Sequence, residues 1–200
     1  MAMGIIFISY DSRHQKLQNL ILQKKNEELK AAIAMQTLLR RKAQTDSLTG
    51  LKNKSTTEEL CRTCLEHEQG DICALFILDL DNFKHINDER GHQAGDVVLR
   101  AFGDTIHKCV RQDDVAGRIG GDEFMIFLKN VPDTALVEKR CQALLRAMSS
   151  LLDGRDGAVR LSCSLGVALA PEHGRAFQEL FHRADNALYQ AKALGKNGYV

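Results

Sequence analysis

The stretch Ile72-Cys73-Ala74-Leu75-Phe76-Ile77-Leu78-Asp79-Leu80-Asp81 decides the fold of this chain. Ile72 to Leu80 is an almost continuous apolar run, which is typical of a strand buried on both faces at the centre of a sheet. Two acids, Asp79 and Asp81, stand at its end. An unpaired buried carboxylate is costly, so acids at this position indicate a functional edge. In an extended strand Asp79 and Asp81 share one face, with Leu80 on the other.

Helical and strand patterns alternate around this run. Strands are expected over 72–80, 115–119, 124–128 and 159–168, and helices over 56–67, 94–110, 134–152 and 177–194. Ser55 or Thr56 is expected to cap the first helix. The order α, β, α, β, β, α, β, α predicts an α+β domain of the ferredoxin-like, split-βαβ type, in which helices surround a central mixed sheet.

A second acidic pair, Asp122-Glu123, follows Gly120-Gly121 between two short strands. The glycines predict a hairpin, and in a split-βαβ sheet this hairpin lies beside the first strand, so Asp79 and Asp122 are expected to meet. Convergent carboxylates without histidine suit Mg²⁺ and phosphoryl or nucleotidyl transfer. The alternative, from these residues alone, is a plain tight turn with a solvated acidic tip.

Residues 12–43 contain no Gly or Pro and are rich in helix-forming residues. Leu22, Leu29, Ile33 and Leu39 form an apolar stripe, which predicts either one amphipathic helix that caps the domain or a parallel coiled-coil stalk. Residues 1–45 are therefore assigned as a helical stalk or linker and 46–200 as the main domain. The apolar run 1–10 is too short to span a membrane. It is also consistent with the cut end of an upstream sensor or membrane segment.

Composition excludes several classes of protein. The chain has 200 residues, 44% of them hydrophobic, and a net charge of +1, so it lacks the basic field of proteins that bind nucleic-acid polymers. Its six cysteines are scattered. Cys61 and Cys64 have CxxC spacing, but no second pair completes a zinc site, so a structural role is favoured over a redox or metal role. Free thiols indicate a reducing, cytoplasmic compartment.

Further motifs accompany the hairpin. They are Arg118-Ile119-Gly120-Gly121-Asp122-Glu123-Phe124, Asp46 to Asn53 (DSLTGLKN), Asp79 to Asp88 (DLDNFKHIND), Gly91 to Asp96 (GHQAGD), Ser164 to Ala168 (SLGVA), Ala184 to Lys192 (ADNALYQAK) and Gly195-Lys196-Asn197. In order and spacing, residues 46–200 resemble the GGDEF-domain diguanylate cyclases. The resemblance implies the palm-like fold of nucleotide cyclases.

The resemblance also implies a metal and catalytic centre. Asp79, Asp122 and the backbone carbonyl of Leu80 are implied as ligands of Mg²⁺, with Mn²⁺ as the second candidate cation. Asp122 is the candidate base for the ribose 3′-hydroxyl, and metal activation alone is the alternative. Glu123 supports the charge and geometry of the site. The same catalytic group includes Gly120 and Gly121, which let a nucleotide approach, and Lys84, which is expected at the phosphates.

GTP is the implied substrate. Asn87 and Asp96 resemble the guanine-reading pair, since Asp accepts from guanine N–H groups and Asn both donates and accepts. Phe83 belongs to the same substrate-binding group. Lys192 and Lys196 resemble the pair that binds the triphosphate. They are four residues apart, on or near the last helix, and this spacing predicts that they face one way. The plainer alternatives are a helix cap at Asp96, a turn cap at Asn87 and a solvated basic helix end.

Arg111-Gln112-Asp113-Asp114 has RxxD form and ends shortly before Gly120. Its position matches the family's product-inhibition motif, so Arg111 and Asp114 are expected to bind cyclic di-GMP. Arg140 is a candidate for the second arginine of this site.

The implied activity joins two GTP into cyclic di-GMP and two pyrophosphates. One domain cannot close the ring, so a homodimer is required. The N-terminal helix is then expected to act as the stalk that dimerises the chain and transmits a signal. The first alternative is a catalytically silent sensor of cyclic di-GMP or GTP. A relative with relaxed base choice and a structural dimerisation module are the others.

Overall fold

The computed structural model describes residues 2–67, 72–151 and 162–200, and it divides the chain into two compact units, residues 1–43 and 44–200. The first unit is formed by helix α1 (Ala2–Gln44). Its apolar residues Leu22, Leu29, Ile33 and Leu39 are exposed. Whether this stripe pairs with a second chain stays a prediction. No helix among the described residues is long and apolar enough to cross a membrane.

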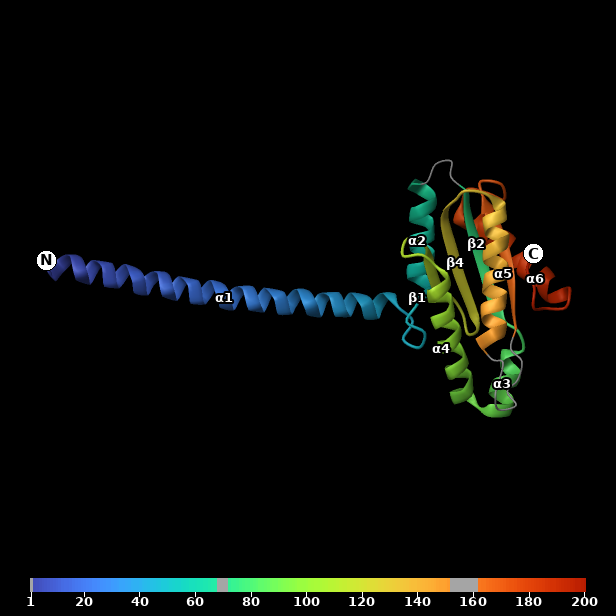
Figure 1. The fold of residues 1–200 in the computed structure, drawn as a ribbon, viewed down its shortest axis with the longest axis horizontal. Coiled ribbons are helices and arrows are strands. Elements are labelled where there is room, and N and C mark those ends of the chain that lie inside the picture. The colour runs from blue at the N-terminus through green and yellow to red at the C-terminus, as the bar shows by residue number, and fades with distance from the viewer. Residues whose placement is uncertain (1, 68–71, 152–161) are drawn as a thin grey trace. The chain divides into compact units, whose positions relative to one another are not determined.

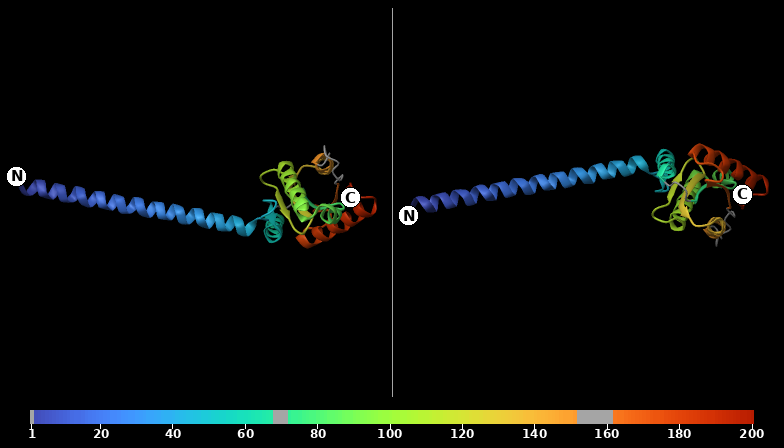
Figure 2. Two further views of the ribbon diagram at one scale, coloured as in Figure 1. Left: turned by 90° about the horizontal axis from the view of Figure 1, so that it is seen from below. Right: turned by 90° about the horizontal axis from the view of Figure 1, so that it is seen from above.

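The second unit contains a five-stranded mixed sheet with helices on both faces (Figures 1 and 2). Its elements in chain order are β1 (Lys52–Asn53), α2 (Lys54–His67), β2 (Ile72–Leu80), α3 (Phe83–Arg90), α4 (His92–Cys109), β3 (Val115–Arg118), β4 (Glu123–Val131), α5 (Thr134–Leu151), β5 (Cys163–Ala170) and α6 (Phe177–Ala193). The strands lie in the order β1-β3-β4-β2-β5. Among the strands of the described residues, β1 pairs in parallel with β3 and the other pairs are antiparallel.

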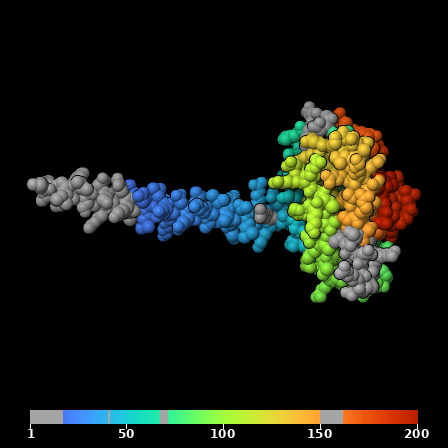
Figure 3. Space-filling model, viewed as in Figure 1, coloured from blue at the N-terminus to red at the C-terminus, as the bar shows by residue number. Residues whose placement is uncertain are grey.

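The predicted split-βαβ fold is confirmed. Strands β2 to β5 occupy the sheet positions of a βαββαβ unit, with the first strand, β2, between the third, β4, and the fourth, β5. The continuous apolar run of β2 follows from this central position. Ala74, Phe76 and Leu78 face the core under α4 and α5, whereas Leu75 and Ile77 face the core under α2 and α6. Figure 3 shows α4 and α5 covering the first of these faces.

Several boundaries differ from the prediction. The helix expected over 94–110 is preceded by a separate helix, α3, and the two-residue strand β1 was also not predicted. The first predicted helix begins two residues early, because the side-chain oxygen of Asn53, rather than Ser55 or Thr56, accepts the capping hydrogen bond from the N–H of Thr56. The strand expected over 159–168 runs from Cys163 to Ala170, and positions 159–161 lie outside the described residues.

Helix α6 lies close against β5 because Gly166 has no side chain. A Cβ at Gly166 would collide with the backbone of Ala184 and Leu188 in α6. Backbone atoms cannot rotate aside as a flexible side chain can, so this contact fixes the distance between the helix and the sheet.

We predict that Gly166→Ala destabilises the domain by about 1–3 kcal/mol, because the added methyl group overpacks the contact between β5 and α6. Urea unfolding followed by circular dichroism measures the change. Gly121→Ala is the matched control, since a Cβ there would meet no atom within 4 Å. Equal stability of the two variants would contradict the assigned contact.

Candidate functional site

The pairing of β2 with β4 brings the two acidic segments together. Asp79 lies opposite Glu123 in the antiparallel register, and the N–H of Leu80 donates to the carbonyl of Asp122 at 3.3 Å. The three predicted acids therefore gather at one edge of the sheet, where β2 ends and β4 begins. Asp122 and Glu123 are half-buried.

Asp79 is the most enclosed of these acids, with 8% of its surface exposed. Burial raises its pKa above the ordinary value, and the charges of Asp122 and Glu123 act in the same direction. The Lys192 ammonium opposes this shift, because its Nζ lies 2.7 Å from Oδ1 of Asp79. The edge thus concentrates negative charge and compensates it with one lysine from α6.

The two glycines of the hairpin have different structural roles. A Cβ at Gly120 would lie 2.6 Å from Oε2 of Glu123, so glycine here makes room for the glutamate side chain. No neighbouring atom requires glycine at position 121, because a Cβ there would meet nothing within 4 Å. The close approach of a nucleotide remains the predicted reason for glycine at this position.

The oxygen atoms at this edge are of the kind that Mg²⁺ prefers: two carboxylates, from Asp79 and Asp122, and the carbonyl of Leu80. In the described part of the chain, no group of three or more His, Cys, Asp and Glu side chains is arranged to hold a metal ion. Mg²⁺ takes few protein ligands and completes its shell with water and substrate phosphates, so two carboxylates and one carbonyl are ligands of the kind that it uses. Asp79 already holds a cation, the Lys192 ammonium, so the residues fit a positive charge at this position.

Helices α3 and α4 bring the predicted base-reading residues together. A Cβ at Gly95 would collide with the Oδ1 of Asn87 and would lie 3.1 Å from Cζ of Phe83. Because Gly95 precedes Asp96, the two half-buried polar residues Asn87 and Asp96 flank one contact between the helices. Lys84, in the first turn of α3, is exposed and forms no ion pair with a described residue.

Lys192 and Lys196 were predicted to lie on or near the last helix, and only Lys192 lies on it. Helix α6 ends at Ala193, and Lys196 lies in the following turn with a positive φ of 65°. The turn nevertheless carries Lys196 to the same region, where its Nζ donates to Oδ1 of Asn82 at 2.7 Å, just beyond the end of β2. The two lysines therefore approach the acidic edge by different routes.

The RxxD segment forms a closed turn. The Asp114 carboxylate accepts hydrogen bonds from the N–H of Arg111 at 2.8 Å and from the N–H of Lys129 at 3.3 Å, and the Arg111 side chain is exposed. Arg140 donates to the carbonyl of Cys109, two residues before Arg111, at 3.2 Å. Both arginines thus lie near the C-terminus of α4.

Two polar networks around the acidic edge were not predicted. Arg118 donates to the Gly121 carbonyl, at 2.7 Å from Nη2, and contacts the Asp46 carboxylate at 3.3 Å. Burial alone would raise the pKa of Asp46, but hydrogen bonds from Thr49 and the charge of Arg118 hold it below its ordinary value. The second network is centred on Asp81, which is buried. Asp46, Asp81 and Arg118 all lie inside the motifs quoted from the sequence, and this position was the signal that could have identified them.

The cysteines contribute no reactive group to this edge. Cys61 of the CxxC segment is fully buried, which raises the pKa of its thiol to about 12. Thiols protonated at neutral pH are poor nucleophiles and metal ligands. The structural role predicted for this segment agrees with these observations.

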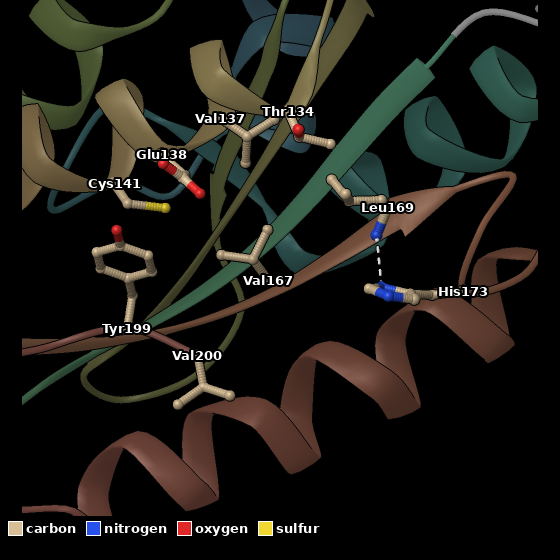
Figure 4. Close-up of a pocket in the computed structure, with 9 residues that line it drawn as sticks. All are labelled: Thr134, Val137, Glu138, Cys141, Val167, Leu169, His173, Tyr199 and Val200. Carbon is tan, nitrogen blue, oxygen red and sulfur yellow. Dashed lines mark hydrogen bonds between the residues drawn. The ribbon is translucent and has the colours of Figure 1, made fainter.

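Cavities lie elsewhere in the domain. One, of about 190 Å³, lies between α5, β5 and the C-terminal residues (Figure 4). It is lined by Thr134, Val137, Glu138, Cys141, Val167, Leu169, His173, Tyr199 and Val200. None of the predicted site residues lines it. The candidate site is therefore the acidic edge rather than this pocket.

Comparison with known families and curated proteins gives a consistent result. The family model described as "Diguanylate cyclase, GGDEF domain" matches residues 43–198. The diguanylate cyclase DgcS of Shewanella oneidensis is 40% identical over 161 residues, covering 78% of this chain and 52% of DgcS. The cyclic di-GMP phosphodiesterase PdeR of Escherichia coli is 38% identical over 166 residues, covering 82% of this chain and 25% of PdeR. The chain thus spans between a quarter and about half of these relatives.

Solved structures agree in fold. The coiled coil and GGDEF domain of DgcB from Caulobacter crescentus, in complex with c-di-GMP, has a TM-score of 0.77 and 30% identity, covering 88% of this chain and 95% of that one. The diguanylate cyclase SiaD of Pseudomonas aeruginosa, in complex with its activator SiaC, has a TM-score of 0.73 and 28% identity, covering 98% of this chain and 77% of that one.

We predict that Asp79→Asn unfolds at an equal or higher temperature than the unchanged chain at about pH 7.5. Because the folded-state pKa of Asp79 is raised, ionisation costs folding free energy above that pKa, and Asn imitates the neutral acid. The difference should vanish below the ordinary Asp pKa, where Asp79 is protonated in both states. Thermal unfolding at several pH values tests this, with the exposed Asp104→Asn as the control for charge. A lower unfolding temperature for Asp79→Asn near neutrality would contradict it.

Proposed function

This chain belongs to the GGDEF family, and from that membership we propose that it is a diguanylate cyclase, which condenses two GTP into cyclic di-GMP and two pyrophosphates. The observation that carries the proposal is the edge where Asp79, Asp122 and Glu123 gather beside Lys192 and Lys196. Named diguanylate cyclases among its relatives support a role in cyclic di-GMP signalling. Since the chain spans only part of these relatives, we also propose the same activity for any longer protein that contains it.

The reaction forms a bond between the 3′-oxygen of one GTP and the α-phosphorus of the other, and pyrophosphate leaves; it occurs twice to close the ring. Asp79, Asp122 and the Leu80 carbonyl are proposed to hold Mg²⁺. When bound, Mg²⁺ supplies positive charge that polarises the α-phosphate and lowers the pKa of the attacking hydroxyl. Asp122 is proposed to accept the hydroxyl proton, and Glu123, packed on Gly120, keeps its carboxylate at the same edge.

The remaining residues bind and orient the nucleotide. Asn87 and Asp96 are proposed to hydrogen-bond to the guanine edge, beside the ring of Phe83. Lys192 and Lys196 are proposed to bind the triphosphate, for which Lys192 exchanges the Asp79 carboxylate for phosphate oxygens. Lys84 is the second residue of α3, which follows the end of β2, and is proposed to add a third cation there.

A homodimer follows from the chemistry, because each domain holds one GTP and the two 3′-hydroxyls attack reciprocally. The exposed apolar residues of α1 support pairing of two helices. We also propose that the domain lies in the cytoplasm, where GTP is available and cysteine thiols stay reduced.

We predict that Asp122→Ala lowers cyclic di-GMP formation by about 100-fold or more, because it removes both a metal ligand and the candidate base. Chromatography of products from GTP and Mg²⁺ measures the rate. Asp104→Ala, an exposed carboxylate on α4, should retain full activity. Unchanged turnover in Asp122→Ala would overturn the catalytic assignment. If the unchanged chain makes no product but binds cyclic di-GMP in calorimetry, the domain is a silent sensor.

The RxxD segment is proposed to bind cyclic di-GMP and to inhibit the enzyme. The exposed Arg111, the ordered Asp114 carboxylate and the neighbouring Arg140 support this role. We predict that Arg111→Ala raises the cyclic di-GMP concentration for half inhibition by about 10-fold or more, since a charge-assisted hydrogen bond is lost. Initial rates at increasing product concentration measure it. Arg100→Ala, an exposed arginine of α4, is the control, and equal inhibition of both variants would exclude the assignment.

A further inference from the structure

Asp81 stands directly after β2 and is 2% exposed. Its Oδ1 accepts from the Ser164 hydroxyl at 2.7 Å, and its Oδ2 accepts from the Ser162 hydroxyl at 2.6 Å and the N–H of Asn197 at 3.0 Å. Both carboxylate oxygens are therefore occupied by donors of the chain itself. This arrangement differs from that of Asp79, whose carboxylate faces the charges of the acidic edge.

The turn that Asp81 holds is a strained one. Lys196 and Asn197 are consecutive non-glycine residues with φ of 65° and 49°. Such a left-handed conformation costs a residue such as lysine about 1–2 kcal/mol, and asparagine less, so Lys196 keeps it only where other contacts fix it. The hydrogen bond from the N–H of Asn197 to Asp81 is one such contact, and the pairing of Leu165 with Gly198 and Val200 is another.

The residue next to Asp81 holds the same turn by its side chain. Asn82 also has a positive φ, 58°, and its Oδ1 accepts from the Lys196 ammonium at 2.7 Å rather than capping α3. Two neighbours at the end of β2 thus bind two neighbours of the turn after α6. Asp81 fixes the backbone at Asn197, and Asn82 receives the charged end of Lys196.

We propose that Asp81 is a positioning residue for the polyphosphate end of the nucleotide. It holds the left-handed turn at residues 196–197 and so places the Lys196 ammonium beside the acidic edge, without binding substrate or metal itself. This inference rests on the proposed function, in which Lys196 binds the triphosphate. The two aspartates of the Asp79-Leu80-Asp81 segment then have different roles. Asp79 contributes negative charge to the acidic edge, whereas Asp81 fixes the position of the turn that carries Lys196.

The test compares binding of two probes by calorimetry: GMP, and the α,β-methylene analogue of GTP, which cannot release pyrophosphate. Asp81→Ala should weaken analogue binding by about 10-fold or more, whereas GMP, which lacks the outer phosphates, should change less than about twofold. Asp81→Asn should recover most of the loss, because its amide oxygen still accepts from Asn197 and its NH₂ group can donate to Ser164. Asp104→Ala is the control.

A double-mutant cycle makes the assignment specific. If Asp81 acts through Lys196, adding Lys196→Met to Asp81→Ala should weaken analogue binding less than about twofold further. Additive losses, equal loss of GMP affinity, or an Asp81→Asn variant as weak as Asp81→Ala would overturn the proposal. The analogue needs no turnover, so the cycle reports on Asp81 even if the chain makes no cyclic di-GMP.

A second measurement covers the case in which Asp81→Ala does not fold. Hydrogen exchange by NMR should show the Asn197 amide of the unchanged chain protected by about 100-fold or more relative to a free peptide. Protection should fall in Asp81→Asn, where a neutral acceptor replaces the carboxylate. An Asn197 amide that exchanges at the free-peptide rate in the unchanged chain would contradict the proposed contact.

Discussion

The antiparallel pairing of β2 with β4 is the constraint on which the site depends. Its register sets Asp79 opposite Glu123 and joins Leu80 to Asp122. A slip of one residue would turn Asp79 to the other face of the sheet, among the apolar residues under α4 and α5. The buried side chains that alternate along β2 oppose such a slip, so the apolar packing on both faces specifies the position of the acids.

The same packing explains why some features could be predicted from the sequence. The run Ile72–Leu80 has to be a central strand, because only burial on both faces suits so many apolar residues, and the GG hairpin has to lie beside it in a split-βαβ sheet. Helix α3 was missed because its start is set by the left-handed residue Asn82 and by contacts from the turn after α6. Local patterns contain no information about such a distant contact.

Lys192 and Lys196 also show that local sequence patterns do not predict tertiary contacts. Spacing predicted that Lys192 and Lys196, on or near the last helix, face one way, but it did not show how Lys196 is held beyond the end of α6 at Ala193. The chain reaches the same region through a left-handed turn that Asp81 holds from 116 positions away in sequence. The types of residue were therefore informative about chemistry, and the tertiary contacts decided the geometry.

Strain and charge concentrate at one place in this domain. Among the described residues, four non-glycine positions have a positive φ, and three of them, Asn82, Lys196 and Asn197, meet at the end of β2. The raised pKa of Asp79 marks the same end as electrostatically unfavourable. Both costs fall where a polyphosphate and a cation are proposed to bind, and binding would relieve the repulsion among the acids. The rest of the sheet, packed on both faces, supplies the stability that lets this edge remain strained.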